Sequence, residues 1–406
     1  MKKLITILFI VFAFVAKSQD TLSILSYNIL NYPLSNATKA DTLKAIIKHT
    51  KPDVFMITEL TSSSGVATIL NNALNVDGVN YYAAATYFNG PDTDNMMFYN
   101  SQKFGLKSQY EIPTVLRNIS EYVLYYKSSD IATTLDTTFL HCYMAHLKAS
   151  NTPADSIQRN QEAVTFKNYL DSKNQPIENI FLGGDFNLYT SQEAAYNTIL
   201  NGGTVSLVDP INTPGDWNNN AAFQSVHTQS TRSGSLGDGG SFGGMDDRFD
   251  FILVGNDVMN GTNKLKYVTN TYTAVGNDGQ HFNKSINASP TNTAVPANVA
   301  DALYYMSDHL PILMKVYYDA ALSVDENNHL ETWSGYFYNN NFMFKSDQNE
   351  NNLNVLVFDV VGKLVENQTI SNANSFKLNL SNLTQGLYFV KVASLKEQKT
   401  FRIVKQ

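Results

Sequence analysis

Cysteine and charged residues are both scarce in this 406-residue chain, and each scarcity excludes a class of protein. The single cysteine, Cys142, leaves no intrachain disulfide to hold the fold. It lies in the apolar run 138–147, where we expect a small buried hydrophobe rather than a catalytic thiol. Charged residues make up 16% and the net charge is −7, which argues against a strongly basic nucleic-acid-binding protein. An acidic enzyme that recruits a divalent cation to an anionic substrate stays open.

Long apolar runs are absent after the N-terminus. Lys2 and Lys3 precede thirteen almost wholly apolar residues, 4–16, and the small residues Ala16 and Ser18 follow. This order is typical of a secretory signal peptide, and the run is shorter than the ~20 apolar residues that span a membrane. The alternative is a buried core helix. We expect a signal peptide at 1–18 and a mature chain that starts near Gln19, has no transmembrane segment and leaves the cytoplasm.

Strand and helix patterns alternate from residue 20 to residue 318, which is typical of a layered α/β domain. The expected strands are 22–27, 54–58, 96–99, 122–126, 139–145, 180–182, 249–254 and 310–317. The expected helices are 36–49, 67–74, 154–170 and 192–200. The hydrophobic share of 43% is too high for a disordered chain and provides a sizeable core.

Several apolar strands stop at a polar residue. They end at or just before Asn28, Glu59, His146, and the pair Asp185 and Asn187. For a single strand, such a residue more often marks emergence into solvent. Together they form a set suited to metal and phosphate chemistry, and strand ends are where loops converge on a cleft.

Three segments rich in small or polar residues offer no chemistry of their own. Six of the eleven residues in 234–244 are glycine, but no GK[ST] follows, which excludes a P-loop. We expect a mobile loop beside the next strand. Segments 201–222 and 271–300 are rich in Asn, Thr and Gly and read as insertions of low regularity.

The polar strand ends match the needs of phosphodiester hydrolysis, which requires a positioned water, stabilised phosphoryl oxygens and a stabilised leaving group. Glu59 can supply the carboxylate that Mg²⁺ prefers, with the neutral oxygen of Asn28 beside it. Asp185 can orient and deprotonate the water, and Asn187 can donate to the phosphate. His309, held by a carboxylate, can be a cationic donor, because pairing raises its pKa. His146 can be a second donor.

Three strings carry a specific resemblance: GGDFNLY at 183–189, DRFDFILV at 247–254 and SDHLPI at 307–312. They follow SYNILNY at 26–32, DVFMITEL at 53–60 and HLKAS at 146–150 in one order. From Thr21 to Tyr318 the sequence resembles the endonuclease/exonuclease/phosphatase superfamily, which includes pancreatic deoxyribonuclease, apurinic endonucleases, bacterial sphingomyelinases and inositol polyphosphate 5-phosphatases. The resemblance implies a four-layered α/β/β/α sandwich with two packed mixed sheets.

The resemblance also implies roles for single residues. Glu59 corresponds to the main metal ligand, with Asn28 adjacent and Asp308 near the metal, which is Mg²⁺ with Mn²⁺ or Ca²⁺ as alternatives. Asp185 and Asn187 match the family's GDxN pair.

Histidine roles follow in the same way. Asp250 corresponds to the carboxylate that orients His309. His146 matches a histidine of the deoxyribonuclease and sphingomyelinase branches, and we expect Asp94 to orient it. Apurinic endonucleases carry an acid where this chain has Leu30, which also favours those two branches.

Plainer interpretations of some residues remain. Asp250 could pair with Arg248, and Asp308 could be a turn residue. No pair of His or Cys has the close spacing of a zinc site. Five further histidines are expected to be surface or packing residues: His49, His141, His227, His281 and His329.

The pattern changes after residue 318. A linker is expected at 319–330, and 331–406 reads as short strands and turns without helical periodicity, which indicates a small all-β sandwich. The strings NVLVFDVVGKLV at 354–365, GLYFVKV at 386–392 and KTFRIVKQ at 399–406 resemble the C-terminal sorting domain of type IX secretion substrates. The alternative is a carbohydrate- or matrix-binding module, for which the aromatic run 336–338 argues.

The sequence therefore predicts a monomeric phosphodiesterase, dependent on Mg²⁺, that the type IX secretion machinery exports through the periplasm to the cell surface or medium. Nucleic acid is the first expected substrate, which makes the chain an extracellular endonuclease. The second is a sphingomyelinase-like or inositol phosphate phosphoesterase activity. A binding protein that keeps the fold without turnover is the third, and the intact set of acids and histidines argues against it.

Overall fold

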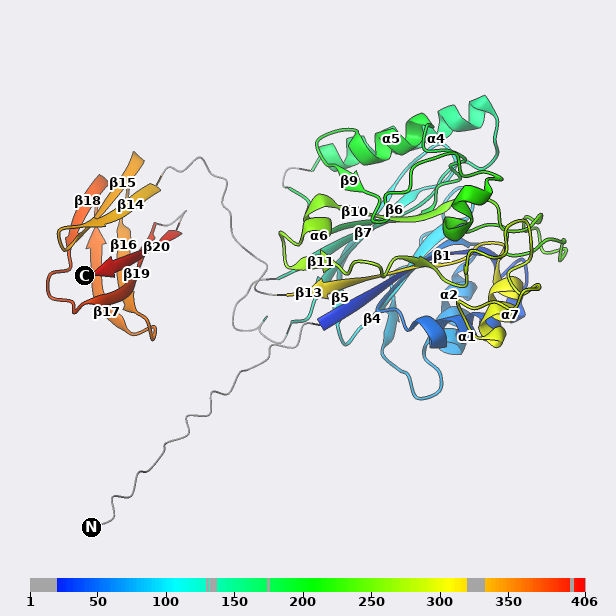
Figure 1. The fold of residues 1–406 in the computed structure, drawn as a ribbon, viewed down its shortest axis with the longest axis horizontal. Helices are drawn as coiled ribbons and strands as arrows, with labels where there is room; N and C mark the ends of the chain where they lie inside the picture. The colour runs from blue at the N-terminus through cyan, green and yellow to red at the C-terminus, as the bar shows by residue number, and fades with distance from the viewer. Residues whose placement is uncertain are drawn as a thin grey trace, which may run out of the picture. The chain divides into compact units, whose positions relative to one another are not determined.

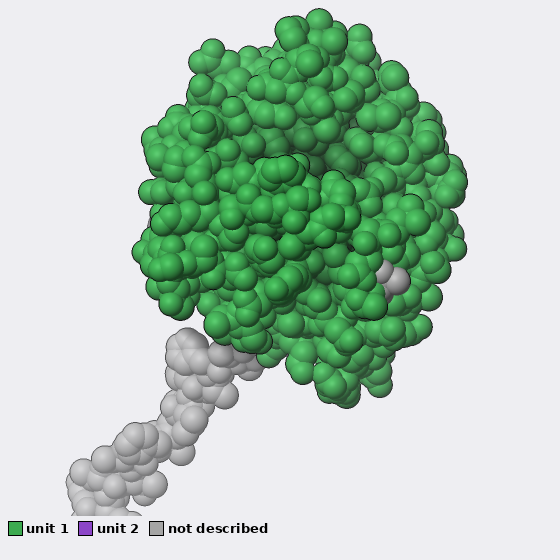
Figure 2. All heavy atoms as spheres, turned by 90° about the vertical axis from the view of Figure 1, so that its right-hand side faces the viewer, with its two compact units in different colours: residues 1–324 green, residues 325–406 purple. Residues whose placement is uncertain are grey.

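The computed structural model describes residues 20–128, 131, 137–173, 176–319, 333–394 and 398–405. The chain forms two compact units, 1–324 and 325–406 (Figure 1; Figure 2 shows the first in green). The predicted signal peptide at 1–18 lies outside the described residues, as does all of the predicted linker except Asp319. Among the described helices, none is both long and apolar enough to cross a bilayer.

Two mixed sheets form the centre of the first unit. One has the strand order β11-β13-β1-β2-β4-β3, with β12 paired to β13, and the other has the order β5-β6-β7-β8-β10-β9. The pairs β1–β2 and β7–β8 are parallel and the remaining pairs are antiparallel. The strands are β1 Asp20–Tyr32, β2 Val54–Leu60, β3 Tyr82–Ala84, β4 Asp94–Asn100, β5 Phe104–Ile112, β6 Ile119–Tyr126, β7 Phe139–His146, β8 Ile180–Asp185, β9 Leu207–Val208, β10 Asp250–Gly255, β11 Leu265–Tyr267, β12 Thr273–Ala274 and β13 Ile312–Tyr318.

Helices cover the outer face of each sheet (Figure 1). The first sheet carries α1 (Ala40–Thr50), α2 (Ser63–Ile69) and α7 (Ala297–Met306), and the second carries α4 (Pro153–Asp171) and α5 (Ala194–Asn201). The short elements are η1 (Ala37–Lys39), η2 (Leu70–Leu74), η3 (Ala221–Val226) and α6 (Asn256–Asn260). This arrangement confirms the predicted four-layered α/β/β/α sandwich.

Two apolar clusters hold the layers together. The larger joins the facing sides of both sheets, where Met56 and Met144 are fully buried, and continues under α1 and α7. The second fills the space between the other face of β7, β8 and β10 and the helices α4 and α5. Cys142 is fully buried in the larger cluster, and burial raises the pKa of its thiol, so it packs as a hydrophobe as predicted.

Two of the longer elements were not expected from the sequence. Strand β5 was not expected, because only its ends are buried and its middle is polar. Helix α7 was also not expected, since the Asn- and Thr-rich segment before it suggested irregular structure up to residue 300. Its buried face, which includes Val299, Leu303 and Met306, packs against α1.

Two adjacent glycines, Gly183 and Gly184, let β8 approach its neighbours closely just before Asp185. A Cβ on Gly183 would lie 2.8 Å from Met56 Cε of the facing sheet. A Cβ on Gly184, whose φ is +143°, would lie 1.8 Å from the backbone oxygen of Ala145 in β7. The close approach of both sheets to β8 therefore requires the GG of the GGDFN string.

The second unit consists of two antiparallel sheets, with strand orders β14-β15-β18 and β17-β16-β19-β20. Apolar side chains of both sheets, among them Trp333, Phe344, Val355 and Val390, form one core. The predicted all-β sandwich is therefore present. The strands are β14 Trp333–Tyr338, β15 Asn341–Glu350, β16 Leu353–Asp359, β17 Leu364–Ile370, β18 Ala373–Asn379, β19 Gly386–Ala393 and β20 Gln398–Lys405.

Replacing Gly184 with alanine should destabilise the first unit. The new methyl group would collide with the Ala145 backbone, and the positive φ strains any L-residue, so we expect the free energy of unfolding to fall by more than ~2 kcal/mol. Urea unfolding of the chain measures this change. The control is Gly234→Ala, where a Cβ meets no atom within 4 Å. Equal stability of the two variants would contradict the expectation.

Candidate active site

The predicted site residues meet where β1, β2, β7 and β8 end and β10 begins. In the second sheet, His146, Asp185 and Asp250 lie side by side in one row across β7, β8 and β10. In the first sheet, Asn28 is paired with Thr58, the residue before Glu59. The structure thus brings together groups that are up to 281 residues apart in the sequence, from Asn28 to His309.

Asn28 links the two sheets at this point. Its Nδ2 donates to Glu59 Oε1 at 2.9 Å and to Asp185 Oδ2 at 3.1 Å, while its Oδ1 accepts from the backbone N–H of Leu30. The amide nitrogen therefore faces the carboxylates here, and an oxygen ligand from Asn28 stays a prediction.

Local backbone strain aims the Glu59 side chain. Glu59 has a φ of 61°, and Leu30 and Asn31 opposite it have φ values of 50° and 46°, at an irregularity in the β1–β2 pairing. This turn of the chain lets the Asn31 N–H donate to Glu59 Oε2 at 2.9 Å. Left-handed backbone outside glycine is costly and concentrates at functional positions.

Asp250 holds His309, as expected. The Asp250 Oδ2 lies 2.8 Å from His309 Nδ1, and His309 Nε2 lies 3.5 Å from Asp185 Oδ2. Burial by itself lowers the pKa of His309, but the charges of Asp250, Asp185 and Asp308 together raise it well above its ordinary value. The alternative partner of Asp250 is excluded, because Arg248 forms a buried double hydrogen bond with Asp209.

His146 lies on the opposite side of Asp185. Its Nε2 is 3.5 Å from Asp185 Oδ2 and 3.8 Å from Glu59 Oε1, beyond ordinary hydrogen-bond distance. Burial lowers the pKa of His146 well below its ordinary value, and the charges of Arg117 and His309 lower it further. Burial thus favours the neutral form of His146, while the carboxylates around His309 favour its charged form.

The expectation that Asp94 orients His146 is wrong. The Asp94 carboxylate accepts from the Tyr87 hydroxyl at 2.5 Å and from the Gly90 N–H at 2.6 Å, so it fixes the loop before β4. The Nδ1 atom of His146 is buried and has no hydrogen-bond partner among the described residues.

Asp185 is the most central carboxylate. Burial, together with the charges of Asp250 and Glu59, outweighs the charge of His309 and raises the pKa of Asp185 to about 7. Its Oδ1 accepts from the backbone N–H of Asn187, whose left-handed φ of 50° turns the chain back toward the site. The Asn187 side chain donates to the Leu147 carbonyl at 3.2 Å.

Two residues that contact Asp308 were missed by sequence reasoning. Gln229 Nε2 donates to Asp308 Oδ2 at 3.0 Å and lies 2.6 Å from His309 Nε2, and the Ser241 N–H donates to the same Asp308 oxygen at 2.7 Å. Ser241 belongs to the glycine-rich segment 234–244, which thus contacts the site. Neither a lone glutamine nor a backbone N–H leaves a recognisable pattern in a sequence.

The glycine-rich segment is anchored by a buried ion-pair triad. Asp238 binds Arg232 Nη1 through both carboxylate oxygens, at 2.7 and 2.9 Å, and its Oδ2 also accepts from Lys39 Nζ at 3.0 Å. These pairs tie the segment to the chain that leaves β1.

The other histidines lie apart from these groups. His281 is bound by Asp278 and by the carbonyls of Ala288 and Pro290, and His227 contacts the Trp217 carbonyl. His49 is on α1 and His141 is in β7. His329 lies outside the described residues.

The residues present fit a divalent cation. Ligand atoms of Glu59, His146 and Asp185 all lie within 4.8 Å of one another. Burial and the nearby charge of Asp308 raise the pKa of Glu59, and Asp308 Oδ1 is buried without a partner among the described residues. Such a surplus of buried carboxylate is stabilised by a bound cation. These three residues come from three different strands. The spacing of residues along the sequence therefore could not show that His146 lies beside the two carboxylates.

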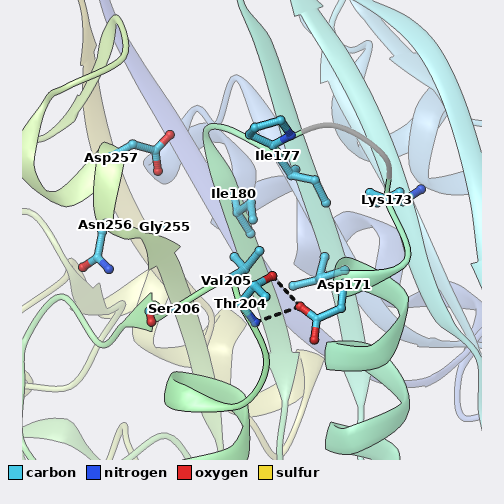
Figure 3. A pocket seen from close by; sticks show the side chains of 12 residues that line it. Asp171, Lys173, Ile177, Ile180, Thr204, Val205, Ser206, Gly255, Asn256 and Asp257 are labelled. Carbon is cyan, nitrogen blue, oxygen red and sulfur yellow. Dashed lines mark hydrogen bonds between the residues drawn. The ribbon is translucent and has the colours of Figure 1, made fainter. Parts of the chain in front are cut away.

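The first unit also has a hollow that lies away from these site residues. It measures about 520 Å³ and lies at the opposite end of the same strands, lined by Ile180 at the start of β8 and Gly255 at the end of β10 (Figure 3). Its Asp171 carboxylate already accepts from the N–H and the hydroxyl of Thr204.

Two protein families match parts of this sequence. The Endonuclease/Exonuclease/phosphatase family matches residues 25–309. The chain belongs to this family. Each activity in the family's name breaks a phosphoester bond, so the matched domain is that of a phosphoester hydrolase. The secretion system C-terminal sorting domain matches residues 338–406, which implies export to the cell surface or medium. No curated protein matches the sequence.

The solved structures that are similar to this chain are distant in sequence. TDP2 from D. rerio, in complex with a single-strand DNA product, is 15% identical with a TM-score of 0.49 and covers 73% of this chain and 98% of its own. The human Nocturnin catalytic domain is 14% identical with a TM-score of 0.44, covering 74% and 98%. A family protein from Bacteroides thetaiotaomicron is 16% identical with a TM-score of 0.42, covering 74% and 96%.

Replacing Asp250 with asparagine should lower the pKa of His309 toward its ordinary value. The variant keeps the shape of the side chain but loses the closest negative charge, so His309 releases its proton at lower pH than in the wild type. NMR titration of the imidazole nitrogens in EDTA measures this. His227, whose pKa burial lowers, is the internal control and should not change. An unchanged His309 titration would contradict the assignment of Asp250.

Proposed function

We propose that this chain is a secreted phosphodiesterase that uses a divalent cation to cleave phosphodiesters by attack of water. The observation that carries the proposal is the convergence of Asn28, Glu59, His146, Asp185 and His309 at one end of two packed sheets. A convergent set of buried acids, amides and histidines is the machinery that phosphoryl transfer to water requires.

Asp185 is the proposed base. Its pKa of about 7 suits a group that accepts a proton from water near neutral pH, and its two oxygens are held by Asn28 and by the Asn187 N–H. Its position between His146 and His309 places the attacked phosphorus between two imidazoles.

The proposed roles of the histidines differ because their charges differ. His309, kept protonated by Asp250, donates to a phosphoryl oxygen and stabilises the charge that develops there. His146 is neutral and can donate to the leaving oxygen or accept from the substrate. Asn187 retains a free amide hydrogen beyond its bond to Leu147 and can donate to the phosphate.

Glu59, with Asp308 and the amide of Asn28 nearby, is the proposed cation site. A divalent cation bound there supplies Lewis-acid stabilisation of the phosphoryl oxygens. Mg²⁺ is the proposed ion, with Mn²⁺ or Ca²⁺ as alternatives, because carboxylate oxygens dominate this donor set.

Two substrates are proposed. Nucleic acid, cleaved by an extracellular endonuclease, is the one predicted from the pairing of His146 with His309 in an exported chain. A sphingomyelin-like phosphodiester is the second. It is favoured by the pairing of the cations near the site, because a long polyanion needs unpaired Lys and Arg to bind.

Removal of the cation should abolish hydrolysis of the small soluble diester bis(p-nitrophenyl) phosphate. EDTA should stop release of p-nitrophenol, and added Mg²⁺ or Mn²⁺ should restore it. Glu59→Gln should weaken this restoration, and Asp185→Asn should lower kcat by ~10²-fold or more because the base is lost. The control is Asp171→Asn, a carboxylate in the hollow at the opposite end, which should leave kcat unchanged. Turnover that persists in EDTA, or in Asp185→Asn, would refute the proposal.

We also propose that the chain, as a monomer, crosses the periplasm and is exported by the type IX secretion machinery through its sorting domain. Deletion of residues 387–406 removes β20 and almost all of β19, two strands of the four-stranded sheet, and should trap the protein inside the envelope. Immunoblots of cell fractions and medium from the producing bacterium measure this. Unchanged release of the truncated chain would refute the export route.

A further inference from the structure

Exposed apolar side chains are unevenly distributed over the first unit. Among its described residues, nine large apolar side chains are exposed, and six of them lie on segments at the catalytic end of the sheets. We call these six the apolar rim. Each leaves between 39% and 82% of its surface exposed. The rim consists of Leu34, Phe88, Val115, Leu236, Phe242 and Tyr305.

The rim comes from five segments that surround the site. Leu34 follows β1, Phe88 lies between β3 and β4, and Val115 lies between β5 and β6. Leu236 and Phe242 belong to the glycine-rich segment before β10, and Tyr305 is on α7.

Several rim residues are close in sequence to residues that contact the site. Phe242 follows Ser241, whose N–H binds Asp308, and Tyr305 precedes Asp308 by three residues. Val115 is two residues from Arg117, which donates to the carbonyl of Leu147, the neighbour of His146.

Rim residues from separate segments are also neighbours of each other. Leu236 and Tyr305 line a common hollow of about 380 Å³, together with Lys39 and Asp238. Figure 2 looks onto the end of the first unit toward which β1 runs, and the surface there is hollowed.

Three cations on these segments, and a fourth on the chain after β7, form ion pairs. Lys39 and Arg232 share Asp238, Arg117 pairs with Asp92 at 3.0 Å, and Lys148 pairs with Asp155 at 3.1 Å. Residues 20–318 contain 18 basic and 27 acidic residues. These four cations are therefore already paired, and the unit carries an excess of acidic residues beside its exposed apolar groups.

We propose that the apolar rim docks the exported enzyme on an electrically neutral lipid surface, where the site hydrolyses a headgroup phosphodiester. This inference rests on the proposed function and specifies its substrate class. Separate apolar side chains on loops can enter the interface between headgroups, and the gain grows with the apolar area buried. The excess of acidic residues disfavours anionic lipid, and the paired cations disfavour nucleic acid.

The reaction at that surface balances with water alone. The water oxygen forms a new bond to phosphorus while Asp185 takes its proton, and one P–O ester bond breaks. The departing oxygen takes up a proton. The products are a phosphomonoester and an alcohol, one of which stays in the lipid layer.

Vesicle binding in EDTA separates docking from catalysis. The chain 19–406, which omits the apolar segment 4–16, is sedimented with vesicles of phosphatidylcholine and sphingomyelin. The wild type should co-sediment, and Leu34→Ser with Phe242→Ser should weaken binding by ~10-fold or more. The matched control is Ile157→Ser with Val164→Ser, two exposed apolar residues on α4 outside the rim. It should bind like the wild type. Equal thermal midpoints of both double variants show that they are folded.

Four outcomes overturn the inference. They are binding that requires anionic lipid, retention of duplex DNA in place of vesicles, equal weakening in the rim and control variants, and no binding by a wild type that turns over bis(p-nitrophenyl) phosphate. The last leaves the proposed function intact. Absence of turnover on both the soluble diester and the vesicles, with Mg²⁺ present, refutes the proposed function itself.

Discussion

Concentration of negative charge at one buried point is the constraint on which this structure depends. Asn28 joins Glu59 to Asp185, and His309 lies within 4.0 Å of Asp185, Asp250 and Asp308. Their mutual repulsion and burial raise the pKa of Glu59 and Asp185, so each carboxylate needs donors to stay in place. Backbone and side-chain N–H groups supply many of these contacts, and the positively charged His309 supplies the rest. The same surplus of charge draws a cation to the site.

The supporting framework is built around close backbone approach. Gly184 allows β7 and β8 to bring His146 beside Asp185, while the left-handed backbone at Glu59 and Asn31 turns the ends of β1 and β2 toward the second sheet. Burial of the two apolar clusters that hold the layers together offsets the free-energy cost of this strained backbone. The packed strands therefore carry most of the acids, while the segments around them carry the exposed apolar groups.

Sequence reasoning found the groups that have a local pattern. The strand ends at Asn28, Glu59 and Asp185 and the SDH string were visible because apolar runs stop there, and the structure brings them together. Gln229 and the Ser241 N–H were invisible, because irregular segments position them through long-range contacts. Asp94 was assigned to the wrong partner, because the sequence around it did not show that Tyr87 and Gly90 would donate hydrogen bonds to its carboxylate. Helix α7 was hidden by the Asn- and Thr-rich chain before it.

The wide separation of the site groups along the sequence has a consequence for when activity begins. Asn28 stands near the start of the first unit and His309 near its end, and neither meets Asp185 until both sheets have packed. A chain still emerging from synthesis, or kept open by a chaperone, holds no assembled centre. Packing of both sheets is thus required before the proposed catalytic centre exists.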